Sequence, residues 1–232
     1  MLKRTWRARK ENIVKVLVVT STPNKEGLTA ACGESARQGV VDGSSRARVI
    51  NLNEFKIERC AVCNGGWGTC LKEHKCVLKD DFAELQDVFE AAEAYAIITP
   101  VYFGEPSEPF KAFFDRLRRC EATKPEKKNS ILHGKPTVAV AAAGGSGNGA
   151  VTCLSTVERL IRQLGAEPFD FVAITQNTRE YQLETIHDAL SSMCSKPEEK
   201  KQALPLSARR KSRGKPRRAT RRRKPREASA RS

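Results

Sequence analysis

The chain has 232 residues, long enough for one sizeable hydrophobic core, and carries a formal net charge of +15. The charge is uneven: residues 1–10 hold five Lys or Arg and no acidic residue, residues 196–232 hold 16 against three Glu, and residues 11–195 hold 21 against 24 Asp or Glu. The central part is therefore not a uniformly basic nucleic-acid-binding domain, and no apolar run approaches the roughly 20 residues that cross a bilayer.

These charges divide the chain into a basic N-terminal extension (1–10), a folded domain (11–195) and a basic tail (196–232). The tail has no apolar period, so we predict that it is disordered. It either stays solvated or binds nucleic acid or an anionic membrane surface without sequence preference, since no aromatic residues interrupt its charges. The N-terminus has no apolar signal-peptide core, so we expect a cytoplasmic protein with reduced cysteines.

Strand-like and helix-like segments alternate through the domain. Runs of β-branched and aliphatic residues predict strands at 13–20, 47–52, 94–99, 137–142 and 169–175, and helical patterns lie at 28–41, 80–92, 108–119, 149–164 and 179–193. Five strands that alternate with helices predict an α/β fold with a parallel sheet covered on both faces. Ligands bind such sheets outside the carboxyl ends of the strands, so the loops after the first, third and fourth strands are the candidate site.

The loop after the first strand is rich in hydroxyl groups and leads into a helix. Free backbone N–H groups and the helix dipole favour an anion at such a position. The sequence here is neither the Walker A pattern nor Gly-x-Gly-x-x-Gly, and ordinary loop and N-cap chemistry explains the same residue types. The candidate phosphate-binding residues are Ser21, Thr22, Asn24, Gly27, Leu28 and Thr29.

The other two loops have different compositions. After the third strand come Pro100, Val101, Tyr102, Phe103 and Gly104, whose aromatic side chains suit a planar ring, although they could also belong to the core. After the fourth strand come Gly144, Gly145, Ser146, Gly147 and Asn148, which let the backbone approach a ligand closely or simply form a flexible connection. Three such loops at one sheet edge predict a flat, phosphorylated ring cofactor.

Four of the eight cysteines lie close together in the sequence. Cys60, Cys63, Cys70 and Cys76 form the pattern Cys-x2-Cys-x6-Cys-x5-Cys. They could hold a [4Fe–4S] cluster that passes single electrons, hold a structural zinc, or remain reduced thiols, because spacing alone does not fix a metal. The remaining cysteines lie in helical patterns and are expected to pack as small apolar side chains: Cys32, Cys120, Cys153 and Cys194.

Together these motifs resemble the flavodoxin-like NAD(P)H-dependent FMN reductase family. Residues 21–29 correspond to the family's phosphate loop, with Ser21 in place of a glycine and Asn24 in place of an arginine. Residues 94–104 correspond to the family's block around the third strand, which is followed by Ser107, Lys111, Asp115 and Arg116. The resemblance covers roughly residues 13–190, and implies a flavodoxin-like, five-stranded parallel sheet with helices on both faces.

The resemblance also implies a cofactor and a reaction. The first loop would hold the phosphate of FMN, residues 100–104 would pack against the isoalloxazine, and residues 144–148 would close over its other side. NAD(P)H would reduce the flavin without a side-chain acid or base, and a small electron acceptor such as a quinone or free flavin would follow. Family members commonly form dimers, so we expect a homodimer. The cysteine motif resembles that of the family's iron–sulfur flavoproteins, whose third cysteine falls where this chain has Gly66.

Overall fold

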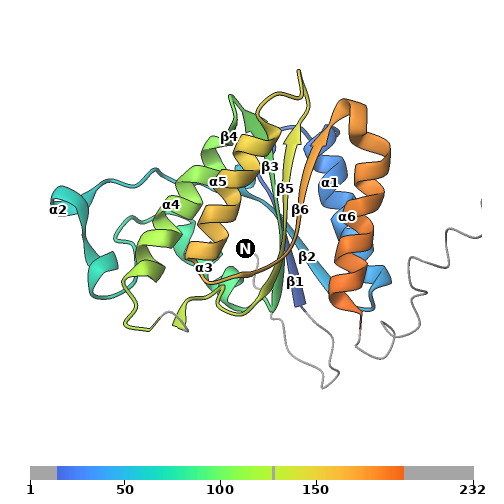
Figure 1. The fold of residues 1–232 in the computed structure, drawn as a ribbon. Helices are drawn as coiled ribbons and strands as arrows, with labels where there is room; N and C mark the ends of the chain where they lie inside the picture. Colours follow the sequence, from blue (N-terminus) through green and yellow to red (C-terminus); the bar gives the residue numbers. More distant parts are fainter. Residues whose placement is uncertain (1–14, 127–128, 196–232) are drawn as a thin grey trace, which may run out of the picture. The chain divides into compact units, whose positions relative to one another are not determined.

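The computed structural model describes residues 15–126 and 129–195 (Figure 1). The N-terminal extension and the predicted disordered tail both lie outside the described residues, as do Ile13 and Val14 of the first predicted strand.

The main sheet is parallel, with strand order β2-β1-β3-β5-β6. Its strands are β1 (Lys15–Thr20), β2 (Arg46–Asn51), β3 (Ala94–Tyr102), β5 (Pro136–Ala143) and β6 (Glu167–Thr175). This topology confirms the predicted α/β fold. The strand order reverses between β1 and β3, so the carboxyl ends of these two strands flank the switch point where ligands bind such sheets.

The sheet has one strand more than predicted. β3 continues beyond Thr99 to Tyr102, and β4 (Glu105–Pro106) pairs with it antiparallel. Phe103 and Gly104 connect the two strands with φ of 52° and 80°, and positive φ at both turn residues suits the twist of a two-residue hairpin. A Phe-Gly pair lacks the Asn or Asp that usually marks such a turn, so the sequence pattern did not reveal it.

Helices cover both faces of the sheet (Figure 1). One face carries α1 (Leu28–Asp42) and α6 (Arg179–Cys194), and the other carries α3 (Phe82–Glu90), α4 (Glu108–Ala122) and α5 (Ala150–Gln163). Alternate residues of β1 face opposite ways: Val16 and Val18 pack on the α1 side, and Leu17 and Val19 on the α4 side. Both faces of β1 are thus apolar, which explains its unbroken hydrophobic run.

Shorter helices lie outside these layers. They are η1 (Leu52–Glu54), α2 (Cys63–Gly66), η2 (Thr69–Leu71) and η4 (Gln176–Thr178). The segment with α2 and η2 projects beyond α4, away from the sheet (Figure 1). Within the described part of the chain, the helices are too short or too polar to cross a bilayer.

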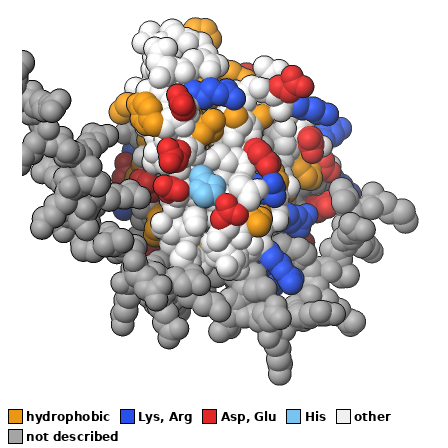
Figure 2. All heavy atoms as spheres, turned by 90° about the vertical axis from the view of Figure 1, so that its right-hand side faces the viewer, with side chains coloured by type: hydrophobic (Ala, Val, Ile, Leu, Met, Phe, Trp, Pro, Cys, Tyr) orange, Lys and Arg blue, Asp and Glu red, His pale blue; other side chains and the backbone are white. Residues whose placement is uncertain are grey.

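The outer surface of α1 and α6 is largely acidic around a histidine (Figure 2). His187 of α6 lies 2.8 Å from Asp42 at the end of α1, measured from Nε2 to Oδ2, and 3.1 Å from Asp188, measured from Nδ1 to Oδ1. Hydrogen bonds to Asp42 and then Asp188 raise the pKa of His187 above its usual value. This contact joins the two helices at the surface.

Candidate cofactor site and cysteine pocket

The N-terminus of α1 opens at the carboxyl end of β1. Gly27 occupies the N-cap position, no side chain caps the helix, and its first turn carries no acidic residue. The N–H groups of that turn are therefore available to an anion, which the helix dipole also favours. The side chains of Leu28 and Thr29 are buried, so these residues present chiefly their backbone N–H groups at the helix N-terminus. Asn24 is exposed.

The hydroxyl groups of this loop mostly fix the loop itself. Ser21 is fully buried and donates to Thr99 Oγ1 at 3.1 Å, while Ser107 Oγ donates to Ser21 Oγ at 2.8 Å. Thr22 Oγ1 accepts the backbone N–H of Asn24 at 3.2 Å. The buried Ser21 hydroxyl thus ties the first loop to β3 and to the start of α4, which leaves the backbone N–H groups as the candidate donors for an anion.

The hairpin between β3 and β4 brings the aromatic residues beside this loop. Pro100 is buried in β3, Val101 is partly buried, Tyr102 is 46% exposed and Phe103 is fully exposed. Tyr102 and Phe103 line a cleft of about 540 Å³ whose opposite wall includes Ser21 and Pro23. The first and second predicted loops therefore border one cleft.

The glycine-rich loop meets the hairpin from the other side. A Cβ atom on Gly149 would lie only 2.6 Å from the Cα of Gly104, so these two backbones are in direct contact. Gly147 and Gly149 have φ of 80° and 78°, which side-chain-bearing residues rarely adopt. Nothing lies within 4 Å of a Cβ placed on Gly145, and the neighbouring Gly144, Ser146 and Asn148 are exposed.

We name residues 21–29, 100–104 and 144–149 the ligand edge. Its uncapped helix terminus offers phosphate donors, its exposed aromatic side chains offer a surface for a ring, and its glycine backbone offers close approach. These features fit a flat, phosphorylated cofactor. Asn51, which the sequence analysis missed, donates from Nδ2 to the carbonyl of Thr22 at 2.8 Å and holds the first loop against the end of β2.

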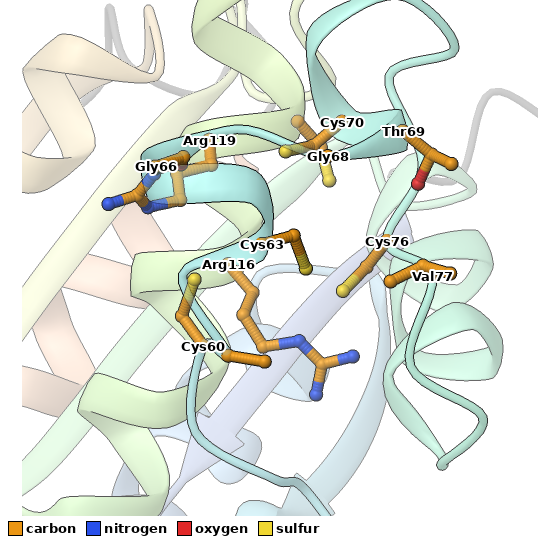
Figure 3. Close-up of a pocket in the computed structure, with 12 residues that line it drawn as sticks. Cys60, Cys63, Gly66, Gly68, Thr69, Cys70, Cys76, Val77, Arg116 and Arg119 are labelled. Atoms are coloured by element: carbon orange, nitrogen blue, oxygen red, sulfur yellow. Dashed lines mark hydrogen bonds between the residues drawn. The ribbon is translucent and has the colours of Figure 1, made fainter.

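The four clustered cysteines line a second, separate cavity. Cys60, Cys63, Cys70 and Cys76 are all partly buried and share it with Arg116, Arg119 and Cys120 of α4 (Figure 3). The sulfur atoms of Cys63 and Cys76 point toward one another in this view. We name this cavity the cysteine pocket, and residues 58–80 the cysteine loop.

The cysteine loop has an unusual backbone. Val62 and Asn64 both have φ of 48°, and Gly65 and Gly66 follow at 71° and 145°. A β-branched residue at positive φ is strained by about 1–3 kcal/mol, so surrounding contacts must hold the turn in place. Arg119 supplies two such contacts, because it donates to the carbonyl of Gly66 and its guanidinium lies 5.2 Å from the ring of Trp67.

Arg116 fixes both ends of the cysteine loop. Its side chain is 1% exposed and bonds both oxygens of Asp80, at 2.5 and 2.9 Å, and the carbonyl of Glu58 at 2.9 Å. Burial alone would raise the pKa of Asp80, but hydrogen bonds from Arg116 and from the backbone of Glu58 hold it below its usual value. Burial would likewise lower the pKa of Arg116, whereas Asp80 and the nearby Cys76 raise it.

Cys120 differs from the other thiols around the pocket. It is 1% exposed, as expected for a packing residue, yet it also lines the cavity. Burial, and then the neighbouring Cys76 and Cys70, raise the pKa of Cys120 to about 12, so it stays a neutral thiol. Burial also raises the pKa of Cys32 and Cys153 to about 12, in keeping with their predicted packing role.

The pocket fits a metal–thiolate group in its chemistry. Four partly buried thiols line one cavity. The buried Nε of Arg116 beside them has no hydrogen-bond partner in the described part of the chain, which suits an anionic sulfur group. Across residues 15–126 and 129–195, however, no group of three or more His, Cys, Asp or Glu side chains is arranged to bind a metal ion. The thiols must therefore rearrange before they coordinate an ion or cluster.

A shallow groove connects the two sites along α4. A cleft of about 660 Å³ shares Asn53, Pro109 and Lys111 with the cleft of the ligand edge and extends to Cys60. Both candidate redox sites thus open to one side of the molecule.

Comparison with known proteins identifies relatives of the chain. The family model described as NADPH-dependent FMN reductase matches residues 14–176. Among curated proteins, an iron–sulfur flavoprotein of Archaeoglobus fulgidus is 27% identical over 104 residues, which are 45% of this chain and 46% of the relative. An iron–sulfur flavoprotein of Methanosarcina thermophila is 31% identical over 143 residues, which are 59% of this chain and 66% of that protein. The chain spans about half the length of the first curated relatives it matches.

Solved structures share the fold at low sequence identity. An NAD(P)H:quinone oxidoreductase from Methanothermobacter marburgensis aligns with a TM-score of 0.60 and 17% identity, covering 78% of this chain and 96% of that one. A flavone reductase aligns with a TM-score of 0.60 and 15% identity, covering 82% of this chain and 65% of that one. At these identities the likeness shows the fold.

Proposed function

The chain belongs to the NADPH-dependent FMN reductase family, and from that membership we propose that it is an FMN-dependent NAD(P)H oxidoreductase. Electrons would pass through bound FMN to a small acceptor such as a quinone or a flavin. The main structural support is the ligand edge, where an uncapped helix terminus, two exposed aromatic residues and an open glycine backbone meet at the switch point of the sheet.

Each part of the ligand edge has a proposed task. The backbone of residues 22–29 at the start of α1 binds the phosphate, while the buried Ser21 hydroxyl keeps that loop attached to β3 and α4. Tyr102 and Phe103 pack against the ring system, and the backbone of residues 144–148 approaches it from the other side. FMN itself supplies the hydride-accepting chemistry when bound, so the protein binds, orients and shields it.

Anaerobic reconstitution tests this function. Purified protein is titrated with FMN and then with NADPH or NADH while the flavin absorption is recorded. Stoichiometric FMN binding followed by bleaching on addition of a reduced nicotinamide supports the proposal. Protein that does not retain FMN, or whose bound FMN stays oxidised with both nucleotides, contradicts it.

We also propose a second, compatible candidate: an iron–sulfur flavoprotein with a [4Fe–4S] cluster at Cys60, Cys63, Cys70 and Cys76. The observation that favours it is the convergence of these four thiols on one cavity next to the unpaired Nε of Arg116. Curated relatives named iron–sulfur flavoproteins add support at the family level. Such a cluster supplies single-electron transfer, which would complement the two-electron chemistry of a flavin.

Iron and acid-labile sulfide analysis tests the second candidate. After anaerobic reconstitution, wild-type protein should hold both, and Cys63→Ser should lose both while still binding FMN. Cys120→Ala is the matched control, because it removes a thiol from the same cavity that burial keeps neutral, and it should keep its iron. Absence of iron from the wild type, or equal loss in both variants, contradicts this candidate.

The oligomeric state is a further part of the proposal. We propose a homodimer, supported by the fully exposed Phe103 at the rim of the cleft, which a second subunit could cover. Analytical ultracentrifugation of the FMN-loaded protein tests this. A monomer at all measured concentrations contradicts it.

A further inference from the structure

The cysteine pocket contains a buried donor without an acceptor. Nε of Arg116 is buried and has no hydrogen-bond partner among residues 15–126 and 129–195, whereas both terminal nitrogens of the same guanidinium are bonded. A buried N–H group without an acceptor is destabilising, so such groups are rare and usually find a partner in a bound water, ion or ligand. Nε belongs to a side chain that lines the cysteine pocket.

The remaining bonds of Arg116 fix the direction of this donor. One terminal nitrogen bonds Asp80 and the carbonyl of Glu58, and the other bonds the second oxygen of Asp80. The ring of Phe82 lies 4.2 Å from the guanidinium carbon and covers one of its faces. Because the guanidinium is planar and held at three points, its Nε–H cannot turn toward another acceptor without breaking these contacts.

Two cysteine sulfur atoms lie beside this donor in the cysteine pocket. The Arg116 side chain runs past Cys63 and Cys76, whose sulfur atoms point into the same space (Figure 3). The buried donor therefore faces sulfur rather than an oxygen ligand.

We propose that Arg116 donates its Nε–H to a sulfur atom of the iron–sulfur group bound in the cysteine pocket and thereby raises the reduction potential of that group. This inference rests on the second candidate function above. A hydrogen bond to sulfur stabilises the added negative charge of the reduced state, so it shifts the potential upward. The same residue that fixes the ends of the cysteine loop would then also set the redox properties of the pocket.

The test compares two arginine-to-lysine variants of the reconstituted protein. Arg116→Lys keeps the positive charge next to Asp80 but places a methylene group where Nε lies. Arg119→Lys is the matched control, because Arg119 also lines the pocket but directs its guanidinium to the Gly66 carbonyl and the Trp67 ring. The readouts are the iron content and the midpoint potential of the iron–sulfur group, measured by anaerobic titration with electron paramagnetic resonance.

We expect Arg116→Lys to retain iron and to shift the midpoint potential to a more negative value, with no comparable shift in Arg119→Lys. An unchanged potential in Arg116→Lys, or equal shifts in both variants, overturns the inference while leaving the cluster in place. Wild-type protein that binds no iron contradicts the second candidate function and, with it, this inference. The iron analysis therefore distinguishes failure of the iron–sulfur candidate from failure of the Arg116 inference.

A second measurement covers the case in which Arg116→Lys does not fold or load iron. Wild-type protein is prepared with arginine isotopically labelled at Nε, and the reduced iron–sulfur group is examined by pulsed electron paramagnetic resonance. A magnetic coupling to the labelled nitrogen that persists in Arg119→Lys supports the hydrogen bond from Arg116. Absence of the coupling from the wild type, or its loss in Arg119→Lys, overturns the inference.

Discussion

The ligand edge and the cysteine pocket open to the same side of the molecule but are held in place by different means. The ligand edge is built from backbone at the carboxyl ends of β1, β3 and β5, and its closest contact joins the backbones of Gly104 and Gly149. The cysteine loop lies outside the sheet, and buried or stacked arginine side chains of α4 attach it. One site depends on the strand order, and the other depends on side-chain contacts with α4, to which Thr123 at its C-terminus adds bonds to Cys70 and His74.

Because of this difference, the two sites should respond differently to substitutions. Strand ends are fixed by the whole parallel sheet, so the ligand edge tolerates changes that leave its glycines and the buried hydroxyl contacts intact. The cysteine loop has no ladder of backbone hydrogen bonds to the sheet, so loss of one buried ion pair should release it.

Breaking the ion pair of Arg116 should release the cysteine loop most strongly. Asp80→Asn leaves the buried guanidinium without its carboxylate, which we expect to cost about 3–5 kcal/mol of unfolding free energy near neutral pH. FMN affinity should change by less than about twofold, since the ligand edge makes no contact with this pair. Chemical denaturation and FMN titration measure the two effects, and Asp115→Asn at the exposed Arg118 pair is the control.

The unfolding free energy lost in Asp80→Asn should decrease at low pH. The pKa of Asp80 is lower in the folded protein than the usual value near 3.9, so the ion pair contributes full stability above that pH. Its contribution is lost as the pH falls through the lower folded-state pKa. The stability gap between wild type and Asp80→Asn should therefore narrow below about pH 4, and a gap that is constant down to lower pH would contradict this origin.

A change in the glycine backbone should damage the ligand edge instead. Gly149→Ala puts a methyl group 2.6 Å from the Cα of Gly104 at a φ of 78°, so we expect strain of about 1–3 kcal/mol and at least a roughly tenfold loss of FMN affinity. Iron content should be unaffected. The matched variant Gly145→Ala meets no protein atom within 4 Å, so it should keep wild-type stability. Equal stability of the two variants would show that the close contact between Gly149 and Gly104 does not hold the ligand edge in place.

The buried hydroxyl contacts should have a smaller effect. Ser107→Ala removes the bond of 2.8 Å to Ser21 and is expected to cost about 1 kcal/mol of unfolding free energy, with a modest loss of FMN affinity as the first loop loosens. Thr185→Ala, which removes an exposed hydroxyl bonded to the Tyr181 carbonyl, is the control. If both variants unfold at the same denaturant concentration as the wild type, the hydroxyl contacts do not hold the loop.

The smallest effect is expected far from both sites, on the α1 and α6 surface. The raised pKa of His187 means that its ion pair with Asp42 adds stability below the usual histidine pKa near 6.5 and loses it as the pH rises through the higher folded-state value. His187→Gln should therefore lower the melting temperature slightly at pH 5.5 and hardly at all at pH 9, with FMN and iron binding unchanged. A larger drop in melting temperature at pH 9 than at pH 5.5 would contradict a stabilising ion pair between protonated His187 and Asp42.

The sequence predicted the ligand edge better than the cysteine pocket for a physical reason. The alternation of strands and helices sets the topology, and topology alone brings residues 21–29, 100–104 and 144–148 to one edge. It could not show that the Ser21 hydroxyl is buried against Thr99 and Ser107, because that contact joins residues 78 and 86 positions apart. The hairpin at Phe103 was also missed, since its turn residues lack the usual signal.

The cysteine pocket depends on contacts that have no local pattern. Cys-x2-Cys spacing suggested a shared site, but the wall formed by Arg116 and Cys120 comes from a helix more than 40 residues further along the chain. Arg116 was noted only as part of a family motif, and its burial and its unpaired Nε are visible only in three dimensions. Cys120 was correctly expected to be buried, but its place in the pocket wall was not foreseen.

We propose that the N-terminus of α1 binds the phosphate of FMN at the ligand edge. The most direct test compares the dissociation constants of FMN and riboflavin, which share the ring system and differ by the phosphate. We predict that FMN binds at least about a hundredfold more tightly, equivalent to about 2.7 kcal/mol, and that added salt weakens FMN more than riboflavin. Equal affinities for the two flavins would contradict the claim.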